Sequence, residues 1–135
     1  MFSAIVVGTD GSPTAARAVA HAAMLTKVSN AALYVVRAYR IGTHDEAERQ
    51  EDVERDLHHD ILALAGDGIE AEAYARVGPA SDVILDLARW KEADLIVMGN
   101  GGTHGARRIL GSVSNSVSHH APCTVLLVPA VTARS

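Results

Sequence analysis

The sequence predicts a single α/β domain over residues 1–135, built on a doubly wound parallel sheet with helices on both faces. Short apolar runs alternate with helical patterns along the chain, as in parallel sheets whose strands are joined by helices. Apolar residues make up 48% of the chain and aromatic residues only 4%, which suits strands buried under helices. A chain of 135 residues is long enough for one hydrophobic core, and no linker-like segment divides it.

Four runs of four or five consecutive apolar residues predict strands that are covered on both faces. These runs are Ala4–Val7, Ala32–Val36, Leu95–Met98 and Val125–Val128. A fifth run, Glu70–Val77, alternates apolar with polar residues and therefore predicts an edge strand with one face in solvent. The predicted sheet thus has five strands.

Helical patterns fill the segments between these runs. Ser12 followed by Pro13 predicts a helix start with Ser12 as the N-cap, and an Ala-rich stretch extends this helix to about Ser29. We expect Ser81 to cap a third helix, and a short fourth helix to run from about Ser112 to His119. An apolar stripe at helical spacing predicts the second helix; its members are Val53, Leu57, Ile61 and Leu64.

The charge and cysteine content argue against several classes of protein. Lys and Arg number 12 against 16 Asp and Glu, so the formal charge is −4 and a nucleic-acid partner is not expected. The single cysteine, Cys123, cannot form an intramolecular disulfide. The apolar runs fall far short of the ~20 residues that span a bilayer, and no signal-like segment opens the chain. We therefore expect a cytoplasmic protein without a membrane partner.

Two segments follow predicted strands at the sheet edge where open α/β folds bind ligands, from Gly8 to Ser12 and from Gly99 to Ser114. Neither matches the Walker A motif or the G-x-G-x-x-G fingerprint of dinucleotide-binding domains. The second segment contains four glycines within seven residues, and a Gly-Ser pair then opens a helix. Its backbone N–H groups therefore suit an anion site. The alternative is a glycine-rich surface loop in which Ser112 merely caps the helix.

Asp10 ends the first predicted strand, across the crevice from Gly99. Its carboxylate could accept hydrogen bonds from a ribose or an adenine amino group, or hold a divalent cation through water. The alternative is a turn residue whose side chain bonds to its own backbone, as Asp-Gly sequences readily do. The sequence alone leaves both interpretations open.

Taken together, these segments resemble the universal stress protein family, and the resemblance covers essentially the whole chain. The matching segments are Ile5–Ser12, Gly78-Pro79, Met98-Gly99, Leu110–Ser114 and His120–Val128. The resemblance implies a Rossmann-like fold of the adenine nucleotide alpha hydrolase type, with strand order 3-2-1-4-5. Family members with the pattern G-x2-G-x9-G-S/T bind ATP. The resemblance therefore also implies an ATP-binding regulatory protein of the universal stress response, with ATP bound alone or together with Mg²⁺.

The resemblance also implies roles for particular residues. Asp10 and the backbone near Thr9 would meet the nucleoside, and the backbone of Ala38 would contact the adenine. A homodimer would form through the last strand, Thr124–Val128. The residues expected to hold the ribose and phosphates are Gly99, Gly102, Gly111, Ser112, Val113 and Ser114, with Met98 beside them.

The glycine loop departs from the family pattern by one residue. Gly99 and Gly102 have the family spacing, but eight residues instead of nine separate Gly102 from Gly111. If Gly101 takes the place of Gly102, the second gap is nine residues and the first shrinks to one. One missing residue moves backbone donors by up to ~3.5 Å, although the extra glycine can absorb part of this shift. The alternatives to ATP are AMP or cyclic AMP, or a nucleotide-free dimeric interaction module.

No set of nucleophile, base and orienting residue can be assembled from Ser, His and Asp at one strand end. The adjacent residues His58 and His59 do not share a helix face, so we expect them on a solvated surface and not in a metal site. We therefore expect a binding protein and not an enzyme, with at most weak ATP hydrolysis.

Overall fold

The computed structural model describes residues 1–41, 49–100 and 111–130. Its strands and helices alternate, with the bounds β1 (Ala4–Gly8), α1 (Pro13–Ser29), β2 (Ala32–Tyr39), α2 (Gln50–Gly66), β3 (Ala71–Val77), α3 (Ala80–Trp90), β4 (Leu95–Asn100), α4 (Ser112–His120) and β5 (Thr124–Pro129). The strands form a five-stranded sheet in the order β3-β2-β1-β4-β5, and every neighbouring pair is parallel. The predicted fold class and strand order are confirmed.

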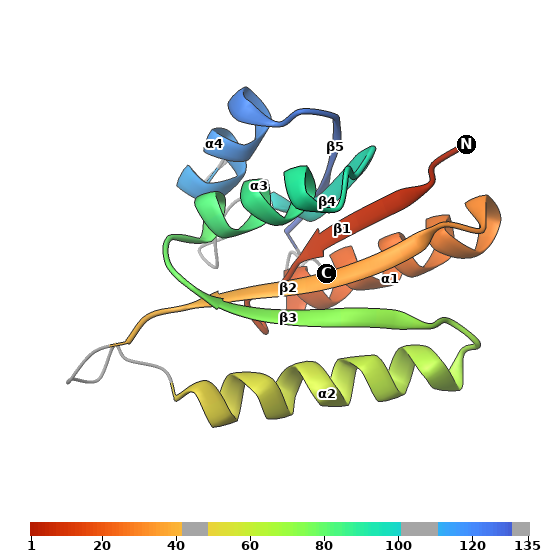
Figure 1. Cartoon of the computed structure of the whole chain (residues 1–135), viewed down its shortest axis with the longest axis horizontal. Helices are drawn as coiled ribbons and strands as arrows, with labels where there is room; N and C mark the ends of the chain where they lie inside the picture. Colours follow the sequence, from red (N-terminus) through yellow and green to blue (C-terminus); the bar gives the residue numbers. More distant parts are fainter. Residues whose placement is uncertain (42–48, 101–110, 131–135) are drawn as a thin grey trace, which may run out of the picture.

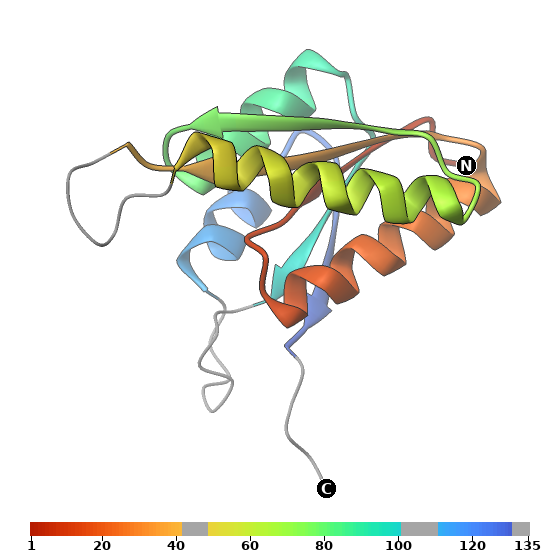
Figure 2. The same ribbon diagram turned by 90° about the horizontal axis from the view of Figure 1, so that it is seen from below.

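Helices cover both faces of the sheet and create two hydrophobic cores (Figure 1). The view from below shows α1 and α2 on one face and α3 and α4 on the other (Figure 2). β1 shows the division, because Ile5 and Val7 pack with α1 and α2, whereas Val6 packs with α3 and α4. All three side chains are fully buried, as expected for a central strand.

The start of α1 has the predicted cap, whereas the start of α3 does not. Ser12 accepts a hydrogen bond from the backbone N–H of Ala15 at 3.1 Å, and α1 begins at the next residue. In α3 the first helical residue is Ala80 and the N-cap is Pro79, so the predicted Ser81 cap is wrong. Gly78, with φ 139°, and the fixed φ of Pro79 turn the chain into the helix before Ser81 is reached.

β3 lies at the edge of the sheet, as predicted, and Glu72 and Arg76 of its polar face are exposed, as expected. Ala71 and Ala75 pack against the core of α1 and α2, while Tyr74 packs against the core of α3 and α4. Trp90 lies edge-on to Tyr74, with the ring centroids 5.5 Å apart. Aromatic packing thus partly covers the face that the alternation assigned to solvent.

The strand order reverses between β1 and β4, which pair through Val7 and Val97. From β1 the chain continues to β2 and β3 on one side, whereas β4 is followed by β5 on the other. The helices that follow these two strands, α1 and α4, pack on opposite faces of the sheet. Such a reversal opens a crevice at this edge of a parallel sheet, where ligands bind in folds of this class.

Candidate functional site

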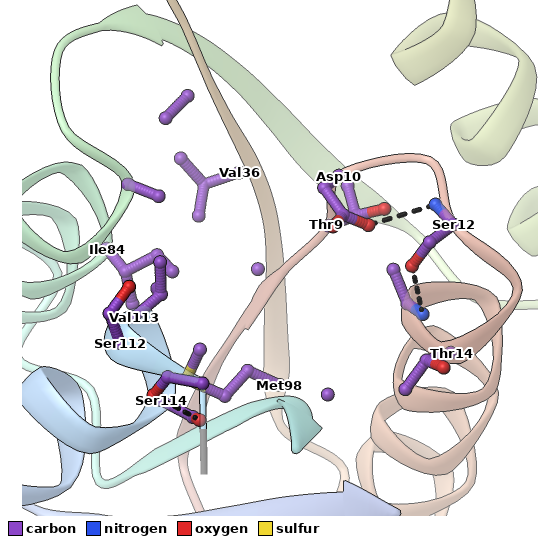
Figure 3. A pocket seen from close by; sticks show the side chains of 16 residues that line it. Thr9, Asp10, Ser12, Thr14, Val36, Ile84, Met98, Ser112, Val113 and Ser114 are labelled. Carbon is purple, nitrogen blue, oxygen red and sulfur yellow. Dashed lines mark hydrogen bonds between the residues drawn. The ribbon is translucent and has the colours of Figure 1, made fainter. Parts of the chain in front are cut away.

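A pocket of about 240 Å³ opens at the carboxyl ends of β1 and β4. The β1–α1 turn lies on one side of it and the start of α4 on the other (Figure 3). It is lined by Gly8, Thr9, Asp10, Ser12, Thr14, Ala15, Val36, Ala38, Ala80, Ile84, Met98, Gly99, Gly111, Ser112, Val113 and Ser114. Each predicted site residue within the described ranges is among them, whereas Gly101 and Gly102 lie outside the described residues. The structure thus brings the two predicted segments together, and their role in binding stays a prediction.

The β1–α1 turn is held by its own side chains. The carboxylate of Asp10 accepts a hydrogen bond from the N–H of Ser12 at 2.9 Å, and the hydroxyl of Thr9 accepts one from the N–H of Gly11 at 3.1 Å. The N–H of Thr9 donates to the carbonyl of Val36 at 3.0 Å, which ties the turn to β2. Asp10 is therefore a turn residue, as the alternative interpretation held. A carboxylate has further lone pairs, so this bond leaves acceptor capacity for a ligand.

One wall of the pocket is apolar. Val36 and Ala38 of β2, Ile84 of α3 and Met98 of β4 line it. Val36, Ile84 and Ala80 were not among the predicted site residues, because no local motif marks them. The glycine at position 8 is the one sequence feature related to Ile84. A Cβ at this position would lie 2.7 Å from Cδ1 of Ile84. The glycine that ends β1 lets α3 come close to the sheet and close the pocket.

The wall that faces the β1–α1 turn is the N-terminal end of α4 (Figure 3). Its N-cap is Gly111 and no side chain caps the first turn, so the alternative in which Ser112 caps the helix is wrong. The N–H of Asn115 makes the bond to the Gly111 carbonyl, at 2.9 Å, which leaves the preceding N–H groups without an acceptor in the helix. Ser114 is buried and donates its own hydroxyl to the Gly111 carbonyl at 3.1 Å. This turn therefore offers backbone donors and the positive end of a helix dipole to an anion.

Gly99 lies where β4 approaches the first turn of α1. A Cβ at this position would lie 2.8 Å from Cγ2 of Thr14, closer than real Cβ atoms come. The glycine therefore permits α1 and β4 to meet at the rim of the pocket. It also leaves the backbone of β4 without a side chain at the rim of the pocket.

The described lining of the pocket contains few charged or metal-binding side chains. Among the described lining residues Asp10 is the one charged side chain, and none is histidine or cysteine. Across residues 1–41, 49–100 and 111–130 no group of three or more His, Cys, Asp or Glu residues is placed to hold a metal ion. His58 and His59 are exposed on α2, as predicted. No helix in these ranges is long and apolar enough to cross a bilayer.

The chain matches known proteins over most of its length. Residues 1–129 match the model of the Universal stress protein family. A universal stress protein of Mycobacterium tuberculosis is 33% identical over 143 residues, covering 94% of this chain and 96% of the relative. One of Methanothermobacter thermautotrophicus is 34% identical over 84 residues, covering 62% of this chain and 58% of that protein.

Two solved structures agree with this match. A universal stress protein in complex with cAMP is 32% identical, with a TM-score of 0.79, and the overlap covers 96% of this chain and 98% of that chain. The universal stress protein of Archaeoglobus fulgidus in complex with dAMP is 25% identical, with a TM-score of 0.71, and the overlap covers 93% and 97%. From its sequence match and its fold alike, the chain belongs to the universal stress protein family.

Proposed function

We propose that this protein binds an adenine nucleotide in the pocket between β1 and β4 and acts as an ATP-binding regulatory protein of the universal stress response. The observation that carries the proposal is the two-sided chemistry of the pocket. Its apolar wall, built around Val36, Ile84 and Met98, suits the face of a purine. The uncapped first turn of α4 suits a phosphate group. Asp10 supplies an acceptor for ribose hydroxyl groups.

Relatives support the adenine part of the proposal. One similar structure is a complex with cAMP and another a complex with dAMP, and both ligands contain adenine and a single phosphate. The residues that would hold such a ligand here are those of the β1–α1 turn, β2 and the start of α4. ATP would use the same residues for its adenine, ribose and first phosphate. Its two further phosphates would extend past the start of α4, and Mg²⁺ would offset part of their charge.

A second candidate is a nucleotide with fewer charges, AMP or cyclic AMP. The described lining carries one charge, the negative charge of Asp10, which disfavours an anion in proportion to the anion's own charge. A single phosphate at the start of α4 is repelled less than a triphosphate. The cAMP complex of a protein 32% identical to this chain favours the same candidate.

We propose binding without efficient turnover, in a cytoplasmic homodimer. The described lining offers no histidine or cysteine as a general base or nucleophile, which favours a binding role. β5 is the other edge strand of the sheet, and its half-buried residues Val125, Leu126 and Leu127 make Thr124–Val128 the proposed dimer contact. Nucleotide occupancy would then set the surface that the dimer presents to a protein partner.

Calorimetric titration of the purified chain with ATP, ADP, AMP, cyclic AMP and GTP, each with and without Mg²⁺, tests the proposal. We expect binding of adenine nucleotides in preference to GTP. Asp10→Ala should weaken binding by about tenfold or more, the loss expected for one charge-assisted hydrogen bond. Asp86→Ala removes an exposed carboxylate of α3 outside the pocket and is the matched control, with unchanged affinity expected.

The order of affinities separates the two candidates. Tightest binding of Mg-ATP supports the first, and tightest binding of AMP or cyclic AMP supports the second. If no adenine nucleotide binds below millimolar concentration, the proposal is wrong. The family membership would then point to a nucleotide-free dimeric interaction module.

A further inference from the structure

Arg37 lies in β2 between two residues of the pocket. Val36 and Ala38 line the pocket, so Arg37 points to the opposite face of the sheet, where α2 lies. Its side chain is only 13% exposed, which is low for a charged residue at the end of a strand. Nη1 lies 3.3 Å from Oδ2 of Asp56 on α2, so the guanidinium is paired.

The guanidinium also rests on the β1–α1 turn. A Cβ at Gly11 would lie 3.1 Å from Nη1, 3.6 Å from Cζ and 3.8 Å from Nη2 of Arg37. The end of the Arg37 side chain therefore occupies the space into which a side chain at Gly11 would project. Gly11 has φ 81°, a left-handed conformation, and lies between Asp10 and Ser12, both of which line the pocket.

Contacts with other elements tie the two ends of the turn to β2 and α1, and Arg37 approaches its middle. At the start, the N–H of Thr9 is bonded to the carbonyl of Val36 at 3.0 Å. At the end, Ser12 caps α1 through Ala15 at 3.1 Å. The bonds of Thr9 to Gly11 and of Asp10 to Ser12 span two residues each, so they lie within the turn and do not connect it to another element. A glycine in this position has wide conformational freedom unless a neighbour restricts it.

Acidic residues of α2 fix the guanidinium from the other side. Asp56 forms the ion pair, and Asp60 follows one helical turn later. Burial raises the pKa of Asp60, the charge of Asp56 raises it further, and the charges of His59 and Arg37 act in the opposite direction. Arg37 is thus within electrostatic reach of both carboxylates, and its position depends on α2.

We propose that Arg37 is a positioning residue of the nucleoside site, which docks the Asp10–Ser12 turn onto β2 and α2. This inference rests on the proposed nucleotide binding and names a residue outside the pocket that sets its affinity. With the guanidinium in place, Asp10 is held in position before the ligand arrives. Without it, the turn must be ordered at the moment of binding, and affinity falls by the free energy of that ordering.

Titration with adenosine, AMP and ATP tests this role in the wild type, Arg37→Gln, Arg37→Lys and Asp56→Asn. Ordering one turn is expected to weaken binding by about two- to tenfold in Arg37→Gln, equally for the three probes because the lost contact concerns the nucleoside. Asp56→Asn should weaken binding less, in the same direction. Arg37→Lys should not restore it, since an ammonium cannot cover Gly11 and reach Asp56 together. Arg55→Gln, with a side chain 70% exposed on α2, is the control and should bind as the wild type does.

Different outcomes overturn the inference in different ways. Equal affinities of the wild type and Arg37→Gln remove the positioning role. In a second outcome, Arg37→Gln loses more affinity for ATP than for adenosine, and Asp56→Asn binds more tightly than the wild type. Arg37 would then act through its charge and not by positioning the turn. Titrations at a temperature where every variant is folded separate affinity from stability. If Arg37→Gln fails to fold, Asp56→Asn alters only an exposed carboxylate and still decides between the two directions.

Amide exchange of the ligand-free protein provides a readout that does not depend on nucleotide binding. Exchange of the Gly11 and Ser12 amides should be faster in Arg37→Gln than in the wild type and in Arg55→Gln. Unchanged exchange would contradict the positioning role. If the wild type binds none of the three probes, the proposed function fails, and the exchange rates alone decide whether Arg37 holds the turn.

Discussion

Replacing Gly99 with alanine probes the close approach of α1 to β4 at the rim of the pocket. The new Cβ would lie 2.8 Å from Cγ2 of Thr14 and 3.8 Å from its backbone carbonyl carbon. The second distance is an ordinary contact, so the clash concerns one methyl group. That methyl belongs to a β-branched side chain with few accessible rotamers, and Thr14 cannot simply turn away.

The expected loss of stability follows from the overlap. Two carbon atoms pack at about 3.5–4.0 Å, so Thr14 or the first turn of α1 must move by about 1 Å. Overpacking of this kind lowers the free energy of unfolding by about 1–3 kcal/mol. For a chain of 135 residues this corresponds to a fall in Tm of about 3–10 °C.

Urea and thermal unfolding followed by circular dichroism measure the effect in a double-mutant cycle. Thr14→Ser removes Cγ2 but keeps the hydroxyl, and by itself it should lower the free energy of unfolding by less than about 1 kcal/mol. In Gly99→Ala/Thr14→Ser the clash is absent, so the double variant should be more stable than Gly99→Ala alone. Gly66→Ala is the control, because no atom lies within 4 Å of a Cβ there. At the end of α2 alanine should be neutral or slightly stabilising.

Two results would refute this reasoning. If Gly99→Ala is as stable as the wild type, α1 and β4 are not packed as closely as the distance indicates. If Gly99→Ala is destabilised but Thr14→Ser does not recover stability, the methyl contact is not the cause. In either case the interpretation of Gly99 as a packing residue at the pocket would be wrong.

Three further predictions concern stability and local environment. Asp94 accepts hydrogen bonds from N–H groups at the start of β1, which lower the pKa of its carboxyl below the usual 3.8. Asp94 therefore stabilises the fold above about pH 4, and this stabilisation is lost as pH falls through the lowered pKa. Asp94→Ala should lower the free energy of unfolding at neutral pH by about 1 kcal/mol or less, because the carboxyl is solvent-screened, and flatten its acid dependence. Gly68→Ala places a side chain in open space at φ 82° and should lower the free energy of unfolding by about 1 kcal/mol in urea titrations, from backbone strain alone. Lys91 Nζ lies 4.0 Å from the ring centroid of Trp90, so Lys91→Met should change the fluorescence of this single tryptophan, and an unchanged spectrum would contradict the contact.

Most of the sheet could be predicted from the sequence because strands buried on both faces leave a local signal. The runs at Ala4–Val7 and Leu95–Met98 are apolar at every position, and both lie in central strands. The start of α1 is equally local, since Ser12 and Pro13 act through contacts only a few residues away. Where burial or capping depends on neighbours in sequence, the prediction succeeded.

The errors arose where a residue's surroundings come from distant parts of the chain. Alternation along β3 predicted a solvated face, and Glu72 and Arg76 are exposed there, but Trp90 of α3 and Tyr34 of β2 pack around Tyr74. Ser81 has the right chemistry for a cap, yet Gly78 and Pro79 had already turned the chain into α3. Neither outcome can be derived from the local pattern, because each depends on how separate elements meet.

The candidate site also contains features that local sequence patterns could not decide. Asp10 was recognisable as either a turn residue or a ligand-binding residue, and its bond to Ser12 at 2.9 Å establishes the first without excluding the second. Both uses need the same backbone geometry, because a carboxylate fixed by its own turn is already oriented for a ligand. The residue that fixes this geometry from outside, Arg37, carried no motif, since its contact with Gly11 joins β2 to a turn that precedes α1. We therefore expect affinity to depend on Arg37 as well as on Asp10, and a normal affinity in Arg37→Gln would show that the turn orients Asp10 unaided.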